Sequence, residues 1–150
     1  MSPSRKGPII AVGAVILDRE GKILLVKRRN PPNAGKWAVP GGKVELGETL
    51  EEAVIRETLE ETSLEVKPTI LLSVVEVVGP VYHYVILDYQ CDVIGGELEP
   101  GSDALEANYF EISDALRTDV PDSMRLLLEE LAKGVERLPI HIAAKLTSLT

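Results

Sequence analysis

Two runs of β-branched residues open the chain and are separated by a polar turn. Ile9 to Leu17 and Lys22 to Lys27 are rich in Val and Ile, and Asp18 to Gly21 lies between them. β-branched residues favour strands, and a short polar segment that ends in glycine favours a turn. The pattern predicts two strands joined as a hairpin within one core sheet.

A loop rich in proline and glycine follows and leads into the first predicted helix. Asn30 to Gly35 and Pro40 to Gly42 exclude regular structure. Thr49 and Glu52 have the spacing of a capping box, in which each side chain accepts a hydrogen bond from the other residue's backbone N–H. Because good helix formers continue from there, we predict a helix from Thr49 to Thr62.

The second half of the chain predicts more strands and one further helix. Ile70 to Val78 and Val81 to Val93 are long apolar runs interrupted at Gly79-Pro80, which indicates two antiparallel strands. An exposed acidic loop, a short strand and a helix with proline in its first turn follow in chain order: Glu97 to Glu106, Asn108 to Glu111, and Pro121 to Lys133. Leu138 to Leu149 fits either a short helix packed on the domain or a partner-binding segment.

Length and composition fit a single domain that spans residues 1 to 150. With 45% hydrophobic residues, a chain of this size buries a core without disulfides or a structural metal. The single Cys91 lies in an apolar run, which indicates a buried thiol and a reducing cytoplasm. Arg5 and Lys6 before an apolar run imitate a secretory signal, but no small-residue cleavage site follows. No run approaches the ~20 apolar residues that span a bilayer, so we expect a cytoplasmic protein without membrane association.

Charge narrows the classes of function. The formal net charge of −8 argues against a general nucleic-acid binder, because affinity for a phosphate backbone requires a basic surface. An anionic small molecule remains compatible with this charge if cations bridge it to the protein. The negative charge is concentrated between Gly42 and Leu64, where seven glutamates accompany only Lys43 and Arg56.

Three of these glutamates share one face of the predicted helix. Glu57, Glu60 and Glu61 stand at positions i, i+3 and i+4. Apolar residues lie on two sides of the helix: Leu50, Ala53, Val54, Ile55 and Leu59. We therefore expect the helix to be sandwiched between layers, with partly buried glutamates that need counter-charges. Carboxylate oxygens suit Mg²⁺ or Mn²⁺ rather than zinc, although spacing alone also fits a solvated acidic helix without a ligand.

The whole segment from Gly42 to Leu64 resembles the signature of the Nudix hydrolase family, G-x5-E-x7-R-E-U-x-E-E-x-G-U, where U is a bulky aliphatic residue. The residues in register are Gly42, Glu48, Arg56, Glu57, Glu60, Glu61 and Leu64. Thr58 replaces the aliphatic residue and Ser63 replaces the second glycine, and neither change removes a charged group. A left-handed backbone at Ser63 costs about 1 kcal/mol. The resemblance implies an α/β (α+β) fold, an α/β/α sandwich with a mixed sheet between helices.

The resemblance also implies a pyrophosphohydrolase that depends on Mg²⁺ (or Mn²⁺). The implied metal ligands are the Gly41 carbonyl and the carboxylates of Glu48, Glu57, Glu60 and Glu61. Arg56 is implied as the partner that orients Glu57. The general base is implied to be either a signature glutamate, Glu57 or Glu61, or an acid on a later loop. Asp103 and Glu106 are the loop candidates, and a solvated acidic loop is the alternative interpretation of both.

Substrate contacts lie outside the signature. Arg28 and Arg29 end the second predicted strand and are candidates for phosphate binding, because guanidinium groups pair with phosphate in bidentate fashion. Pro80 falls 16 residues past Leu64, where ADP-ribose pyrophosphatases of this family often carry a proline. The resemblance thus favours a nucleoside diphosphate linked to another group as substrate, with ADP-ribose yielding AMP and ribose 5-phosphate. It also implies a homodimer, with the tail from Val135 as a candidate contact.

Two alternatives stay open at this point. One is an enzyme that hydrolyses oxidised or surplus nucleoside triphosphates, whose relatives cleave dinucleoside polyphosphates or sugar nucleotides. The other is a Nudix-like binding module without turnover, although such modules usually lack a metal glutamate and this chain keeps all three.

Overall fold

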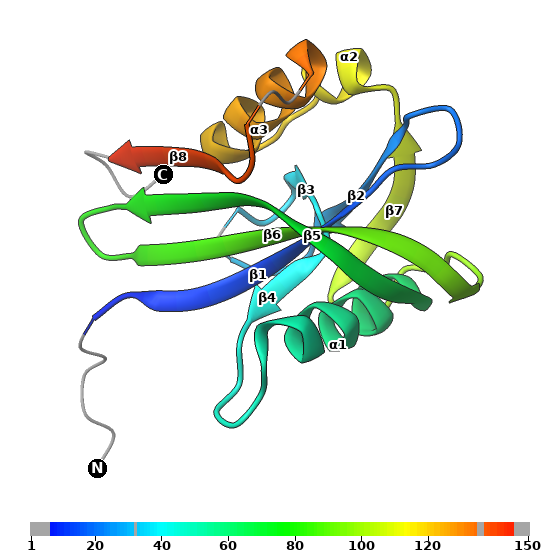
Figure 1. Ribbon diagram of the computed structural model, residues 1–150, viewed down its shortest axis with the longest axis horizontal. Helices are drawn as coiled ribbons and strands as arrows, with labels where there is room; N and C mark the ends of the chain where they lie inside the picture. The colour runs from blue at the N-terminus through cyan, green and yellow to red at the C-terminus, as the bar shows by residue number, and fades with distance from the viewer. Residues whose placement is uncertain (1–6, 32, 135–136, 146–150) are drawn as a thin grey trace.

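The computed structural model describes residues 7–31, 33–134 and 137–145 (Figure 1). Arg5, Lys6 and the end of the predicted segment Leu138 to Leu149 lie outside these ranges. The elements in chain order are β1 (Ile9–Ile16), β2 (Ile23–Arg28), β3 (Trp37–Ala38), β4 (Gly41–Lys43), α1 (Leu50–Thr62), β5 (Leu64–Val78), β6 (His83–Gly96), β7 (Ala104–Phe110), α2 (Ile112–Ala115), α3 (Asp122–Lys133) and β8 (Ile140–Lys145). Within the described part, none of the helices has the length and apolar character needed to cross a membrane.

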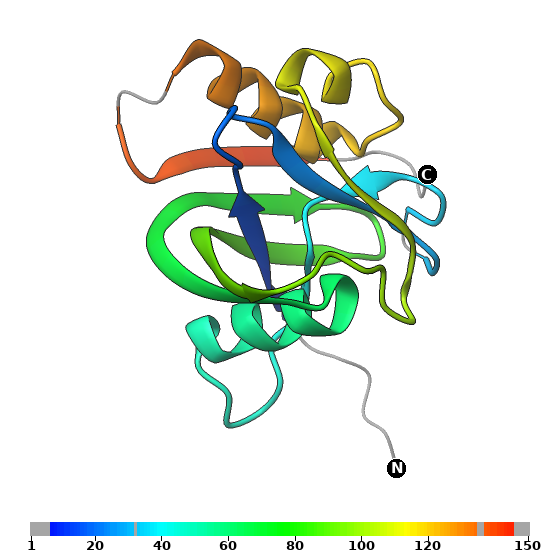
Figure 2. The ribbon, with the colours of Figure 1, turned by 90° about the vertical axis from the view of Figure 1, so that its right-hand side faces the viewer.

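The described strands form two sheets. The larger sheet has the order β4-β1-β6-β5-β8 and is mixed, because β1 runs parallel to β6 whereas β5 runs antiparallel to it. The smaller sheet has the order β3-β2-β7. Helix α1 lies on one side of the larger sheet, and α2 and α3 lie on the other (Figures 1 and 2). This arrangement confirms the predicted α/β/α sandwich.

The predicted hairpin of the first two strands is wrong in its pairing. The chain does turn between them, where Asp18 Oδ1 accepts hydrogen bonds from the backbone N–H groups of Glu20 and Lys22, each at 2.9 Å. After a single bridge between Leu17 and Ile23, however, β1 joins the larger sheet and β2 the smaller one. Both strands are continuous apolar runs that pair equally well with several neighbours, so their sequence does not select the partner.

Helix α1 begins as predicted but is less enclosed than expected. Thr49 Oγ1 accepts from Glu52 N at 3.1 Å and Glu52 Oε1 accepts from Thr49 N at 2.9 Å, which completes the capping box. Ala53 packs against the larger sheet and is fully buried. Ile55 and Leu59, by contrast, are 41% and 48% exposed. The predicted sandwiching of this helix between two layers is therefore wrong, and its outer side faces solvent.

Four further predictions on the second half of the chain need correction. Strand β5 begins at Leu64, immediately after α1, and the acidic loop ends earlier than predicted because β7 begins at Ala104. Pro121 is the N-cap of α3 and precedes its first turn. The described part of the tail is neither a helix nor a free segment, since β8 pairs in parallel with β5 from Ser73 to Val78. A short apolar run at the edge of a sheet has no local signal that separates strand from helix.

Apolar clusters fill both sides of the larger sheet. One cluster lies between this sheet and α3, around Val15, Val75 and Leu127, and the other lies under α1, around Val54. Cys91 is buried in the second cluster, where burial raises the pKa of its thiol to about 12. The predicted buried thiol is thus confirmed.

One carboxyl group lies among the apolar residues on the α3 side of the sheet. Asp88 of β6 is 3% exposed, and its Oδ2 accepts a hydrogen bond from Ser73 Oγ at 3.0 Å. Its other oxygen, Oδ1, has no hydrogen-bond partner among the described residues. Burial raises the pKa of Asp88 to about 6, against the smaller lowering effect of the Ser73 hydroxyl.

We expect Asp88→Asn to stabilise the protein at neutral pH but not in acid. The folded-state pKa of Asp88 lies above its ordinary value of 3.8. Asp88 is therefore neutral in both states below about pH 4, and its ionisation increasingly disfavours folding up to about pH 6. The full difference between the folded and unfolded pKa of Asp88 corresponds to about 3 kcal/mol in the free energy of unfolding. Urea unfolding at about pH 4 and pH 7 measures it, with exposed Asp92→Asn as the control, and an equal gain at both pH values would contradict the assignment.

Candidate functional site

The acidic face of α1 meets β4 and the loop before β7 at a small cavity of about 190 Å³. In Figure 1, α1 lies directly beside β4. The cavity is lined by Val26, Arg28, Asn30, Gly41, Gly42, Lys43, Glu57, Glu61 and Asp103. These residues come from segments far apart in the sequence, so the fold brings together the helix glutamates, two glycines, one arginine and one aspartate of a distant loop.

Glu57 and Glu61 are the two helix carboxylates that line this cavity. Glu61 is 8% exposed, and its Oε2 accepts a hydrogen bond from the backbone N–H of Gly41 at 3.3 Å. Burial, and next the negative charge of Glu57, raise the pKa of Glu61 to about 8. Burial also raises the pKa of Glu57, although Arg56 partly offsets this effect. Two such carboxylates side by side require a counter-charge to remain ionised together.

Arg56 holds the acidic residues in place. Its Nε and Nη2 donate to the two carboxylate oxygens of Glu48 at 2.6 and 2.9 Å, and its Nη1 donates to Glu57 Oε1 at 2.6 Å. Nη2 also donates to the backbone carbonyl of Lys43 at 3.1 Å, which ties α1 to β4. The hydrogen bonds from Arg56 lower the pKa of Glu48 to about 2, and those carboxylates raise the pKa of Arg56. Such a charge-assisted fork fixes orientation as well as charge.

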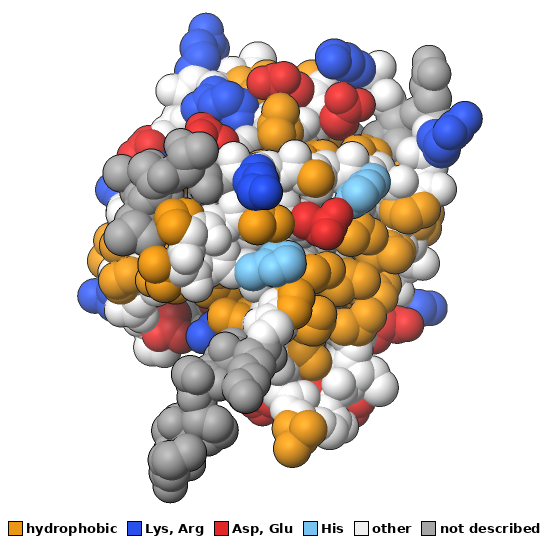
Figure 3. Space-filling model, turned by 90° about the vertical axis from the view of Figure 1, so that its left-hand side faces the viewer, with side chains coloured by type: hydrophobic (Ala, Val, Ile, Leu, Met, Phe, Trp, Pro, Cys, Tyr) orange, Lys and Arg blue, Asp and Glu red, His pale blue; other side chains and the backbone are white. Residues whose placement is uncertain are grey.

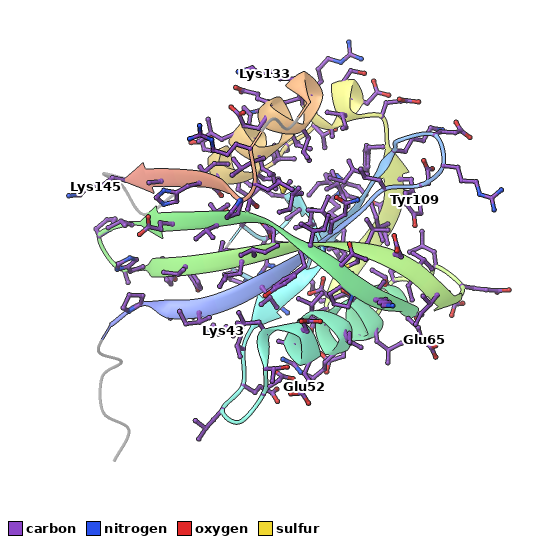
Figure 4. The ribbon with its side chains drawn as sticks, in the orientation of Figure 1. Lys43, Glu52, Glu65, Tyr109, Lys133 and Lys145 are labelled. Atoms are coloured by element: carbon purple, nitrogen blue, oxygen red, sulfur yellow. The ribbon has the colours of Figure 1, made fainter. Side chains whose placement is uncertain are left out.

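Two adjacent glycines let β4 approach its neighbours. A Cβ atom on Gly42 would lie 2.5 Å from the Glu57 carboxylate, and one on Gly41 would lie 2.1 Å from the backbone oxygen of Val12. Any side chain at either position would therefore displace the glutamate or the neighbouring strand. Lys43 follows on β4 beside α1, as Figure 4 shows, and is exposed.

The other predicted site residues lie farther out. Glu60 is exposed, with its Oε2 3.4 Å from Arg56 Nη1, and is not part of the cavity lining. Glu106 was predicted in the loop, but it lies in β7 and pairs with Lys27 at 3.6 Å. Asp103, the other loop candidate, does line the cavity.

The loop that carries Asp103 is fastened to the end of α1. Gly101 N donates to the Glu61 carbonyl at 2.8 Å, and Ser63 Oγ donates to the Glu99 carbonyl at 3.2 Å. A Cβ atom on Gly101 would lie 1.7 Å from the Glu60 carbonyl oxygen, so only glycine allows this approach. Ser63 has the left-handed φ of 65° that its position in the signature implies. The loop therefore holds Asp103 in place relative to the glutamates of α1.

A larger cavity of about 790 Å³ adjoins the small one. The two share Arg28, Gly41, Gly42 and Lys43. Residues that line only the larger cavity include Lys36, Val75, Val77, Pro80, Tyr82, Tyr84, Ile86, Asp88, Met124, Leu127 and Lys145. Lys145 lies at the end of β8 beside the β5–β6 hairpin (Figure 4). The volume and the mostly apolar walls of this larger cavity are those of a small-molecule site.

Arg28 and Arg29 lie in different surroundings, and the two histidines lie outside both cavities. Arg28 lies where the two cavities meet, whereas Arg29 is exposed and donates from Nε to the Ser102 carbonyl at 3.0 Å. His141 Nε2 lies 2.6 Å from Glu76 Oε2. Figure 3 shows the histidines on an outer face, beside a cluster of apolar side chains. Neither His83 nor His141 lines the two cavities described above.

The residues of the small cavity fit a divalent cation by their chemistry. The buried carboxylate of Glu61 and the half-buried one of Glu57 have raised pKa values, and with nearby backbone oxygens they are the hard donors that Mg²⁺ and Mn²⁺ prefer. Among the described residues, no three acidic, His or Cys side chains are grouped closely enough to hold a cation as they stand. Arg56 holds Glu57 and Glu48, and Glu61 faces the Gly41 N–H, so the carboxylates point to separate partners.

Helix α1 presents its glutamates beside the glycine strand β4 in an α/β/α sandwich. This chain belongs to the NUDIX domain family, whose model matches residues 7–131. The chain is 47% identical over 109 residues to an ADP-ribose pyrophosphatase of Methanocaldococcus jannaschii, which covers 71% of this chain and 64% of that protein. It is 35% identical over 141 residues to the 8-oxo-dGDP phosphatase NUDT18 of Homo sapiens, covering 91% and 42%. The chain thus spans less than two thirds of these curated relatives. The crystal structure of a MutT protein from Methanosarcina mazei Go1 matches with a TM-score of 0.78 at 27% identity, covering 89% of this chain and 100% of that one.

Proposed function

We propose that this protein is a divalent-metal-dependent pyrophosphohydrolase that cleaves ADP-ribose to AMP and ribose 5-phosphate. One observation carries the proposal: Glu57 and Glu61 line a cavity that adjoins a second one of small-molecule size, with four lining residues in common. The 47% identity to an ADP-ribose pyrophosphatase supports the substrate. The position of Pro80 in the wall of the larger cavity agrees with it.

The metal in this proposal is Mg²⁺ or Mn²⁺. Nudix hydrolases generally need a divalent metal, and here the Gly41 carbonyl and the carboxylates of Glu57 and Glu61 are the central candidate ligands. Glu48 and Glu60 lie at the edge of the site, where Arg56 contacts both. A bound ion of this kind neutralises phosphate oxygens and lowers the pKa of a coordinated water.

The chain's own residues supply the remaining steps. Arg28, at the junction of the cavities, is our candidate for binding the diphosphate, whereas Arg29 holds the Asp103 loop. Asp103, rather than Glu106, is our candidate for the base, because it lines the cavity beside the helix glutamates. A water oxygen attacks one phosphorus, its proton passes to the Asp103 carboxylate, and the bridging P–O bond breaks to release the two monophosphates.

A second candidate function is the hydrolysis of oxidised nucleoside phosphates. The 35% identity to an 8-oxo-dGDP phosphatase over nearly the whole chain favours it. A binding module without turnover is disfavoured, because Glu57, Glu60 and Glu61 are all present and Arg56 positions one of them. The homodimer and the cytoplasmic location remain predictions; light scattering of the purified protein tests the first.

A product assay with Mg²⁺ tests the proposed function. The panel contains ADP-ribose, nucleoside triphosphates, 8-oxo-dGDP, sugar nucleotides and dinucleoside polyphosphates. We expect AMP and ribose 5-phosphate from ADP-ribose, with kcat/KM about tenfold or more above the other substrates, and complete loss of turnover with a chelator. Mg²⁺ should also raise the melting temperature, because it binds the folded state. A preference for 8-oxo-dGDP or triphosphates would replace ADP-ribose, and no turnover of any substrate would overturn the proposal.

A further inference from the structure

Neighbouring strands place Gly41, Gly13 and Asp88 in one row across the larger sheet. Gly13 of β1 pairs with Gly41 of β4 on one side and with Asp88 of β6 on the other. Since adjacent strands lie about 4.8 Å apart, the Asp88 and Gly41 backbones are about 10 Å apart. Gly41 borders the small cavity, and all three residues line the large one. This row leads from the proposed diphosphate position into the large cavity.

Among the described residues, only one of the two oxygens of the Asp88 carboxyl group has a hydrogen-bond partner. Ser73 donates to Oδ2, whereas Oδ1 lies over Gly13 with no partner among the described residues. A Cβ atom on Gly13 would lie 2.1 Å from Oδ1, so the carboxyl occupies the space that a side chain on β1 would need. A buried acceptor without a donor costs free energy and is uncommon in folded proteins. The site therefore calls for a hydrogen-bond donor from outside the described chain.

The surroundings favour a flat aromatic ring as the group that brings this donor. A Cβ atom on Gly13 would lie 2.1 Å from Asp88 Oδ1 and 3.1 Å from Val39 Cγ2, so Val39 is an apolar neighbour of the carboxyl, and both residues line the cavity. Val75 and Ile86 also line the cavity, and Tyr82 and Tyr84 stack on each other in its wall with their ring centroids 5.9 Å apart. Apolar and aromatic walls suit a base better than a sugar.

We propose that Asp88 is a specificity-determining residue that accepts a hydrogen bond from the 6-amino group of adenine in the large cavity. The inference rests on the proposed function. It specifies that the large cavity holds the adenine end of the substrate and that the 6-amino group is the group recognised. Adenine carries a donor at this position, whereas hypoxanthine and guanine carry a carbonyl acceptor. In the position that adenine takes, a carbonyl would face the Asp88 carboxylate and leave both acceptors unpaired, and the ring would have to shift to present its N1–H instead, so bases with an oxygen there should bind more weakly.

Nucleobase discrimination tests this inference directly. We compare kcat/KM for ADP-ribose, inosine diphosphate ribose and ADP-glucose in the wild type, Asp88→Asn, Asp88→Leu and the control Asp92→Asn, which changes an exposed aspartate of the same strand. The wild type should prefer ADP-ribose by about tenfold or more. Asp88→Asn should narrow the preference mainly by lowering KM for the inosine substrate, because an amide offers either a donor or an acceptor. Asp88→Leu should bring the ratio near one by raising KM for ADP-ribose, and Asp92→Asn should keep the wild-type ratio.

The outcomes separate this inference from the proposed function. If the wild type cleaves ADP-ribose and the ratio is the same in folded Asp88→Asn and Asp88→Leu, Asp88 does not read the base, and the proposed function stands. If the variants change the ratio of ADP-ribose to ADP-glucose instead, Asp88 contacts the distal sugar and the inference is overturned. If the wild type cleaves neither ADP-ribose nor its inosine analogue, the proposed function and the inference both fail. Melting temperatures of all variants show whether each is folded.

Discussion

Glu57→Gln and Glu61→Gln are each expected to lower kcat for ADP-ribose by about 10³-fold or more. Glutamine keeps the size of the side chain and still accepts hydrogen bonds from Arg56 or from the Gly41 N–H. It carries no charge, so the cavity loses the electrostatic attraction for a divalent cation. Turnover of ADP-ribose at saturating Mg²⁺ measures the effect, and Glu51→Gln on the exposed side of α1 is the matched control.

The stability of the same variants separates catalysis from folding. Since burial disfavours the charged form of both glutamates, neither variant should melt below the wild type without metal. The rise in melting temperature with Mg²⁺ should disappear in both but persist in Glu51→Gln. Wild-type turnover in both glutamine variants would remove these residues from the mechanism.

Asp103→Asn is expected to lower kcat by about 10² to 10⁴-fold, whereas Glu106→Gln should change it by about twofold or less. Asp103 lines the cavity with the helix glutamates, whereas Glu106 forms an exposed pair with Lys27 on the smaller sheet. Asparagine keeps the shape of Asp103 but accepts no proton. Rates of ADP-ribose cleavage in the two variants, with melting temperatures alongside, measure the contrast. A larger loss of kcat in Glu106→Gln than in Asp103→Asn would identify Glu106, and not Asp103, as the general base.

The sequence predicts the parts of this structure that depend on local interactions. The start of α1 follows from a capping box of two residues, and the spacing of Glu57, Glu60 and Glu61 follows from helical geometry. The pairing of β1 and β2 with different sheets does not follow, because it depends on which distant strands compete for each edge. The same holds for β8, whose strand conformation depends on the open edge of β5.

The site is predictable to a similar extent. The acidic helix is contiguous in sequence, so its spacing together with the resemblance to the Nudix signature identifies its candidate ligands. The choice between Asp103 and Glu106 depends on where β7 begins, and this is set by the contact of the preceding loop with α1. Asp88 lies within a predicted apolar strand and is not among the predicted site residues. Alternation along the strand from Ile86 places Asp88 on the core face, and that period of two is the signal that identifies it.

The hydrogen bond from Gly101 to the end of α1 also restricts where residues can be inserted into this chain or deleted from it. Only two residues separate Gly101 from Ala104, where β7 begins, and Asp103 is one of them. An inserted or deleted residue in that interval would shift Asp103 relative to Glu61, because both ends of the interval are anchored. The turn between β4 and α1 is restrained as well, although Leu46 at its tip is fully exposed, because Glu48 N donates to the Glu45 carbonyl at 3.0 Å and Arg56 binds the Glu48 carboxylate. Length differences among related chains should therefore be excluded both between Gly42 and Glu48 and between Gly101 and Ala104.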